Sequence, residues 1–243
     1  MNKRTLLIIV AALVVVSAAL FWRSHLVSNP NVPTQTAEPA APAAPVDLAA
    51  LQAKAGAGDA SAQTKLGYVY EKGTGVTPNM KEAVKWFKLA ADQNDPEAQV
   101  ALGELTQAGQ GVKADPAAAA GLYQAAAEKG SVAGQYDLAY LYEQGIGVDK
   151  NETNAAKWYQ LAAEGGDPLA QYDIGQRYEL GMGVQADHVQ AYKWYTLAAA
   201  QGQSDSTSKL HDLKSQMSSD EIAKADNMAK AFVARAPNSK PAN

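Results

Sequence analysis

Four glycine-rich turns are the first residues of this sequence whose types could bind a ligand. A phosphate-binding loop also uses glycines to bring backbone N–H groups around an anion, but such a loop follows a strand and occurs once. These turns occur four times, and the pattern before each of them predicts a helix. A structural role is therefore favoured over a nucleotide cofactor. The turn glycines are Gly73, Gly75, Gly109, Gly111, Gly145, Gly147, Gly181 and Gly183.

Asp137 and Asp173 occupy equivalent positions in two copies of a repeated pattern, so their carboxyl groups could lie near each other. Two such groups can serve as a general acid and a general base. A solvated acidic face is the favoured interpretation. The sequence carries neither a G-x-S-x-G turn nor an S-x-x-K motif, so nothing marks a nucleophilic hydrolase. We expect no catalytic residues and no enzyme activity.

Composition argues against metals and nucleic acids as ligands. The chain has no cysteine and three histidines, and His25, His188 and His211 form no close pair of the kind that binds zinc. Its formal net charge is −4 and its pI is near 5.4, whereas nucleic-acid binders rely on basic residues that neutralise phosphates. We therefore expect no metal, no cofactor and no nucleic-acid partner.

The turns belong to a unit that recurs every 36 residues, as the step from Gly73 to Gly109 shows. A repeat of this length predicts a solenoid, in which each unit buries its apolar face against its neighbours. Within a unit the apolar residues before and after the turn are spaced for two helices. Polar residues such as Asn79 and Asp115 stand where a side-chain oxygen would cap the second helix. One column of the second helix holds Trp86, Leu122, Trp158 and Trp194.

The unit reads A-Q-x-x-L-G-x-x-Y-x-x-G-x-G-V-x-x-[ND]-x-x-x-A-x-x-W-[FY]-x-x-A-A and resembles the Sel1-like repeat, a relative of the tetratricopeptide repeat. The 34-residue tetratricopeptide unit is the nearest alternative, but the 36-residue step and the G-x-G-V turn favour Sel1-like. The resemblance implies an all-α, right-handed α/α solenoid. We place the four units at residues 59–94, 95–130, 131–166 and 167–202.

The ends of the array fit helical caps. Residues 47–58 match the back half of a unit and predict a half-repeat helix. Residues 203–235 resemble the closing helices of bacterial Sel1-like proteins, and Ser218 to Glu221 form the pattern of a capping box. Residues 236–243 are expected to be a disordered tail.

The amino-terminal residues predict export. An apolar run from Leu6 to Trp22 gives roughly 25 Å of helix, near the lower limit for crossing a bilayer. Lys3 and Arg4 precede it, which places the amino terminus in the cytoplasm. We predict a transmembrane anchor at residues 1–23 that holds the chain in a bacterial inner membrane. A cleaved signal peptide, leaving a soluble periplasmic protein, is the alternative. Residues 24–46 are rich in proline and alanine and predict an extended linker.

The side of each first helix opposite its apolar stripe changes from copy to copy, as expected of a surface that contacts a partner. In relatives the first helices line the concave side of the solenoid. Tyr68 and Tyr140 would be aromatic anchors beside charged neighbours. Residues 47–202 carry 12 basic against 19 acidic residues, which would steer a basic partner toward them. The candidate partner-binding residues are Lys65, Tyr68, Lys72, Glu104, Asp137, Tyr140, Gln144, Asp173 and Gln176.

The resemblance implies protein binding rather than catalysis. Our leading hypothesis is a periplasmic, membrane-anchored scaffold or adaptor for proteins of the cell envelope. An immunity protein that neutralises a secreted toxin is the alternative within binding. A cell-wall enzyme or a binder of peptidoglycan or β-lactams is the third hypothesis, because cysteine-rich relatives are linked to that chemistry. This chain lacks their cysteines.

Overall fold

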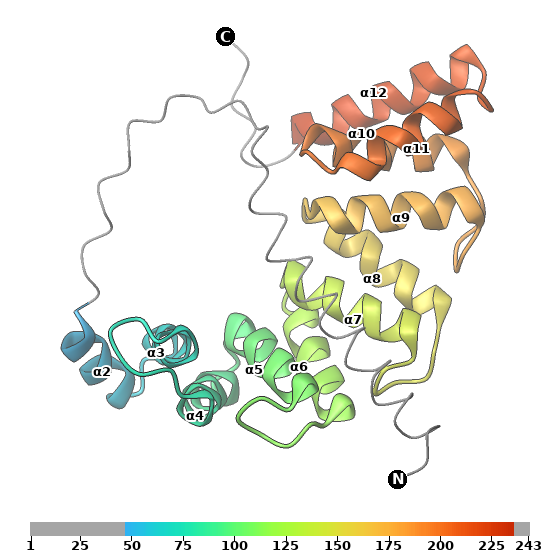
Figure 1. Ribbon diagram of the computed structural model, residues 1–243. Coiled ribbons are helices and arrows are strands. Elements are labelled where there is room, and N and C mark those ends of the chain that lie inside the picture. The colour runs from blue at the N-terminus through green and yellow to red at the C-terminus, as the bar shows by residue number, and fades with distance from the viewer. Residues whose placement is uncertain (1–46, 236–243) are drawn as a thin grey trace. The chain divides into compact units, whose positions relative to one another are not determined.

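The computed structural model describes residues 47–235, which fold as one helical unit with eleven helices and no strand (Figure 1). The expected anchor and linker, and the expected tail from residue 236, lie outside these residues. None of the helices within residues 47–235 is long and apolar enough to cross a membrane. The helices are α2 (Leu48–Gly56), α3 (Ala60–Lys72), α4 (Met80–Asp92), α5 (Pro96–Ala108), α6 (Pro116–Glu128), α7 (Val132–Gln144), α8 (Glu152–Glu164), α9 (Pro168–Leu180), α10 (His188–Ala200), α11 (Ser204–Lys214) and α12 (Ser219–Arg235).

Each unit is a pair of helices, and the pairs stack in chain order. The first helices α3, α5, α7 and α9 pack against the second helices α4, α6, α8 and α10 of their own units. Each second helix also packs against the first helix that follows it, and α5 contacts α7 directly (Figure 1). At the ends, α2 packs on α3, while α11 and α12 both pack on α10. The prediction of an all-helical solenoid is confirmed.

Short polar side chains begin the helices and glycines end the first helix of every unit. Asn79, for example, accepts hydrogen bonds from the backbone N–H groups of Lys81 and Glu82, as expected for the cap of a second helix. Gly73 ends α3 with φ of 72°, a left-handed conformation that other residues adopt at a cost. The equivalent glycines of the other units adopt the same conformation.

The two helices of a unit approach closely where the first helix carries a small residue. A Cβ atom at Gly67 would lie 2.5 Å from the Phe87 ring, and one at Gly103 would lie 2.7 Å from the Tyr123 ring. Gly175 has the same relation to the ring of Tyr195. The aromatic side chain of the second helix therefore packs directly on the backbone of the first.

The second glycine of each turn makes a contact between units. A Cβ atom at Gly147 would collide with the backbone carbonyl of Pro116, the first residue of the preceding unit's second helix. Gly111 meets the carbonyl of Met80 in the same way. Nothing lies within 4 Å of the corresponding position at Gly75, in the first unit. These glycines therefore permit the close stacking of neighbouring units.

The closing helices α11 and α12 pack on the last unit. Ser218 and Glu221 form the predicted capping box, because the Ser218 N–H donates to the Glu221 carboxylate and the Glu221 N–H donates to the Ser218 hydroxyl. Phe232 of α12 meets the Trp194 ring edge to face, with 5.4 Å between ring centroids. Trp194 is consequently buried, whereas Trp86 and Trp158 in the same column are half-buried.

Alanine at two of the turn glycines should separate the cost of the backbone conformation from the cost of the contact between units. Gly75→Ala strains only a left-handed backbone, for about 1 kcal/mol. Gly147→Ala adds the collision with Pro116 and should cost ~1–3 kcal/mol more, because an overpacked contact must shift. Urea denaturation of the two purified variants measures the difference. Equal midpoints would show that the contact does not hold the stack together.

Candidate binding surface

One side of each first helix is only partly covered by the neighbouring helices. On α7 this side comprises Ala133, Tyr136, Asp137, Tyr140, Glu143 and Gln144, all of which are half-buried or exposed. The residues at the equivalent positions of the 36-residue repeat on α3, α5 and α9 complete what we call the first-helix face. Thr64, Val100 and Ala101 are its buried members.

All nine residues predicted to bind a partner lie on the first-helix face, and the structure divides them by exposure. Lys65, Lys72 and Gln144 are exposed. The other six are half-buried, so they already contact the protein itself: Tyr68, Glu104, Asp137, Tyr140, Asp173 and Gln176. Their contact with a partner stays a prediction.

Tyr68 lies on the surface and also contacts other residues of the protein. Its ring meets Phe87 edge to face at 4.9 Å, and the Lys72 ammonium lies 5.2 Å from the ring centroid. Burial, followed by the nearby carboxylate of Glu97 in the next unit, raises the pKa of its hydroxyl. Tyr140 likewise packs beside a buried cluster. Alanine at either tyrosine would therefore disturb packing together with any binding.

The expectation of a solvated acidic face is wrong for Asp173. This side chain is half-buried and interacts with Tyr136 of the preceding unit, which lowers its pKa. Burial, followed by repulsion from Glu143, raises the pKa of Asp173 to about 7, although Tyr136 and Arg177 act in the opposite direction. The side chain thus interacts with residues of unit three, although it belongs to unit four.

Arg177 is a buried cation that the sequence analysis did not single out. It stands in a column otherwise filled by Val69, Leu105 and Leu141, and only 1% of the residue is exposed. The sequence held one signal for this site: a basic residue at a position that is apolar in the other three units. Such a residue needs partners of opposite charge if it is buried.

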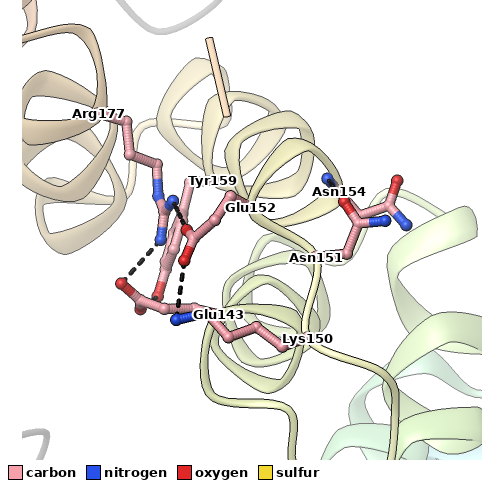
Figure 2. Close-up of polar contacts among 7 residues, drawn as sticks. All are labelled: Glu143, Lys150, Asn151, Glu152, Asn154, Tyr159 and Arg177. Atoms are coloured by element: carbon pink, nitrogen blue, oxygen red, sulfur yellow. Dashed lines mark hydrogen bonds and ion pairs between the residues drawn. The ribbon is translucent and has the colours of Figure 1, made fainter. Parts of the chain in front are cut away.

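The partners of Arg177 come from two helices of the preceding unit, as Figure 2 shows. Its guanidinium lies 2.8 Å from the Glu143 carboxylate and 2.7 Å from that of Glu152, and it stacks over the Tyr159 ring at 4.9 Å. Lys150 reaches Glu152 at 3.0 Å. The Arg177 hydrogen bond is the main reason that the pKa of Glu152 is lowered. This network, which we call the Arg177 cluster, connects α9 to α7 and α8.

A tyrosine–acceptor hydrogen bond recurs inside three of the units. The hydroxyl of Tyr159 donates to Glu143 over 2.9 Å, and that of Tyr195 donates to Glu179 over 2.6 Å. Tyr123 makes the equivalent bond to Gln107 over 3.2 Å. These bonds connect one edge of the first-helix face to the tyrosines of the second helices.

The acidic side chains of the described residues are spread out rather than gathered at one point. No group of three or more His, Asp or Glu side chains from 47–235 is placed to hold a metal ion. Asp173, whose pKa is raised to about 7, interacts with Tyr136 of the preceding unit. The face is therefore a spread of polar and aromatic side chains on a rigid helical support.

Comparison with known proteins identifies the repeat. The Sel1 repeat family model matches residues 60–95, 96–131, 132–167 and 168–203. The protein belongs to the Sel1 repeat family. Sel1 repeat solenoids typically bind protein partners and are generally non-enzymatic scaffolds. None of the curated proteins matches the sequence.

Solved structures share the fold of this Sel1 repeat protein. A Sel1 repeat protein from Oxalobacter formigenes is 36% identical, with a TM-score of 0.64, and the match covers 74% of this chain and 76% of that one. A protective antigen of uropathogenic Escherichia coli is 32% identical, with a TM-score of 0.68. That match covers 75% of this chain but only 41% of the antigen chain, so this protein spans less than half of its length.

A third structure is more distant. The immunity protein Pa5087 from Pseudomonas aeruginosa is 19% identical, with a TM-score of 0.45, over 76% of this chain and 70% of that one. A likeness of this degree supports no functional conclusion about the chain.

The raised pKa of Asp173 predicts a specific pH dependence of stability. Between the ordinary carboxyl pKa and about 7, the folded state holds a proton that the unfolded state has lost, so this group's contribution to stability falls as pH rises through that window. Asp173→Asn removes the titration and should gain stability relative to wild type by about 1 kcal/mol or more between pH 5 and pH 8. Urea midpoints at the two pH values measure the gain. Asp92→Asn, at an exposed carboxylate, is the control; equal behaviour of the two variants would contradict the assignment.

Proposed function

We propose that this protein is a non-enzymatic scaffold or adaptor that binds protein partners of the bacterial cell envelope through the first-helix face. The supporting observation is the contrast between two sets of positions on the same helices. The columns facing the second helices keep their residue types from unit to unit, whereas the first-helix face carries Lys65, Ala101, Asp137 and Asp173 in a single column. Positions that differ in this way can present different side chains to different parts of a partner.

The location is part of the proposal. The apolar run at residues 6–22 follows Lys3 and Arg4, which favours an inner-membrane anchor with the solenoid in the periplasm. The following proline- and alanine-rich segment would hold the solenoid away from the bilayer. The absence of cysteine is compatible with an exported domain that needs no disulfide.

Site-specific photocrosslinking in intact cells tests the surface. A crosslinking amino acid at Gln144, an exposed position on the first-helix face, should capture one or a few envelope proteins. The same residue at Lys88, an exposed position on α4, is the matched control and should not capture them. Mass spectrometry identifies the captured proteins. The same capture from both positions, or none from Gln144, would contradict the assignment of this face.

A reporter fusion tests the location. Alkaline phosphatase joined after residue 243 becomes active only outside the cytoplasm, and we expect full activity in the membrane fraction. Replacing Leu13 and Val14 with arginine should abolish that activity, because charges at the centre of the apolar run oppose insertion. Activity in the soluble periplasmic fraction would instead show a cleaved signal peptide. An inactive wild-type fusion would overturn the envelope location.

A further inference from the structure

Three of the four units carry the same group of side chains on the second helix. In each of them a lysine, a tryptophan and a leucine follow the spacing K-W-x-x-L, and we call this group the Lys–Trp–Leu triplet. The triplets are Lys85, Trp86 and Leu89 in unit one, Lys157, Trp158 and Leu161 in unit three, and Lys193, Trp194 and Leu197 in unit four. The lysine ammonium lies over the neighbouring indole ring in all three, 5.4, 5.2 and 3.7 Å from the ring centroid. The protein therefore holds three copies of one local arrangement, and unit two has other residues at all three positions.

In unit four the closing helix α12, which packs on α10, covers the triplet (Figure 1). The Phe232 ring of α12 meets the Trp194 ring edge to face at 5.4 Å, and the Lys193 ammonium lies 5.3 Å from the centre of the Phe232 ring. Trp194 and Leu197 belong to a buried cluster that also contains Ala229 of α12. Burial lowers the pKa of Lys193. The protein itself thus binds an aromatic side chain of a helix at this triplet.

The side of α12 that packs on α10 shows which kind of helix fits the triplet. Its buried residues are Ala225 and Ala229, whose small side chains let the two helices come close together. Phe232 follows Ala229 by three residues and so lies on the same face. Other sides of α12 carry exposed charged residues such as Lys224 and Lys230. The occupant in unit four is therefore an amphipathic helix that presents one aromatic ring.

The triplet of unit one has the same residue types but is more exposed. Leu89 is 41% exposed, whereas Leu197 is 5% exposed. Lys85 is exposed and Trp86 is half-buried, whereas the lysine and the tryptophan of unit four are half-buried and buried. Unit three is intermediate, because Leu161 is half-buried. Unit one therefore presents the most open copy of a site that α12 fills in unit four.

We propose that the Lys–Trp–Leu triplet of unit one docks an amphipathic helix of a partner protein, with an aromatic side chain of that helix against Trp86. The contact in unit four selects this occupant, because the same three residue types there bind a helix through a phenylalanine ring. Edge-to-face aromatic contact and the burial of Leu89 stabilise the complex. The triplet lies on a second helix and not on the first-helix face, so its occupant is a second partner and the inference does not depend on the proposed function.

A photocrosslinking peptide tests the position of the site. The probe has the sequence of residues 218–235, with the aromatic crosslinker benzoylphenylalanine in place of Phe232. It is irradiated with the full-length protein in mild detergent, and mass spectrometry of the digest identifies the labelled residues. We expect labelling of α4 close to Trp86. Labelling that leaves α4 untouched would overturn the inference, and labelling of α10 alone would show that the peptide only displaces α12.

Matched variants measure how much the triplet contributes. Leu89→Lys replaces the exposed leucine of the triplet, and Leu180→Lys makes the same change on the first-helix face, where Leu180 is 61% exposed. Fluorescence anisotropy measures the binding of a fluorescein-labelled peptide of residues 218–235 that retains Phe232. Binding should weaken about tenfold or more in Leu89→Lys and about twofold or less in Leu180→Lys. Both positions are exposed, so both variants should fold, which circular dichroism checks.

A second peptide, with Phe232→Ala, tests the role of the aromatic ring. It should bind about tenfold more weakly than the first peptide, because it cannot make the contact with Trp86. Equal binding of the two peptides would show that the ring is not what the site recognises. Equal weakening by the two protein variants would show that added charge, rather than loss of the triplet, reduces binding. Binding of neither peptide up to about 1 mM would show that unit one does not accept such a helix.

Discussion

The stack depends on backbone contacts at its turns, where Gly111, Gly147 and Gly183 lie against the first residue of the preceding unit's second helix. A helix pair of this length cannot bury its apolar side alone, so its stability comes from the neighbours on either side. The turn contact sets how close those neighbours lie. At the junction of units three and four, Gly183 meets the carbonyl of Glu152, the residue whose side chain reaches Arg177. The steric contact and the ionic contact therefore hold the same two units in the same register.

The junctions differ in how well their polar groups are satisfied. Gln135 and Gln171 each donate a side-chain hydrogen bond to a carbonyl of the preceding unit. Gln99 occupies the same column between units one and two, and its buried Oε1 has no hydrogen bond. The last two units are thus joined by more polar contacts than the first two, although the repeat is regular in sequence.

Much of the fold could be predicted because each local signal occurs four times. The caps at Asn79 and Asp187, the left-handed glycines and the capping box at Ser218 all depend on short-range geometry that a residue's neighbours in sequence determine. The candidate surface was predictable only as a face of each helix. Its internal contacts, such as Tyr136 with Asp173, join residues from different units and depend on how the units stack. Arg177 could not be predicted from the repeat pattern, because that pattern consists of what the copies share and unit four departs from it at this position.

The tyrosine–acceptor bonds have a consequence for how such an array can grow. Tyr123, Tyr159 and Tyr195 each bond to a residue sixteen positions earlier, within the same unit. A duplicated unit therefore carries both halves of this bond with it and needs no matching change in its neighbours. Arg177 is the opposite case, because its carboxylate partners belong to the preceding unit. A copy of unit four placed behind unit two would meet Gln107 and Pro116 at the positions of Glu143 and Glu152, and would bury a charge with neither carboxylate partner. Unit four therefore depends on which unit precedes it.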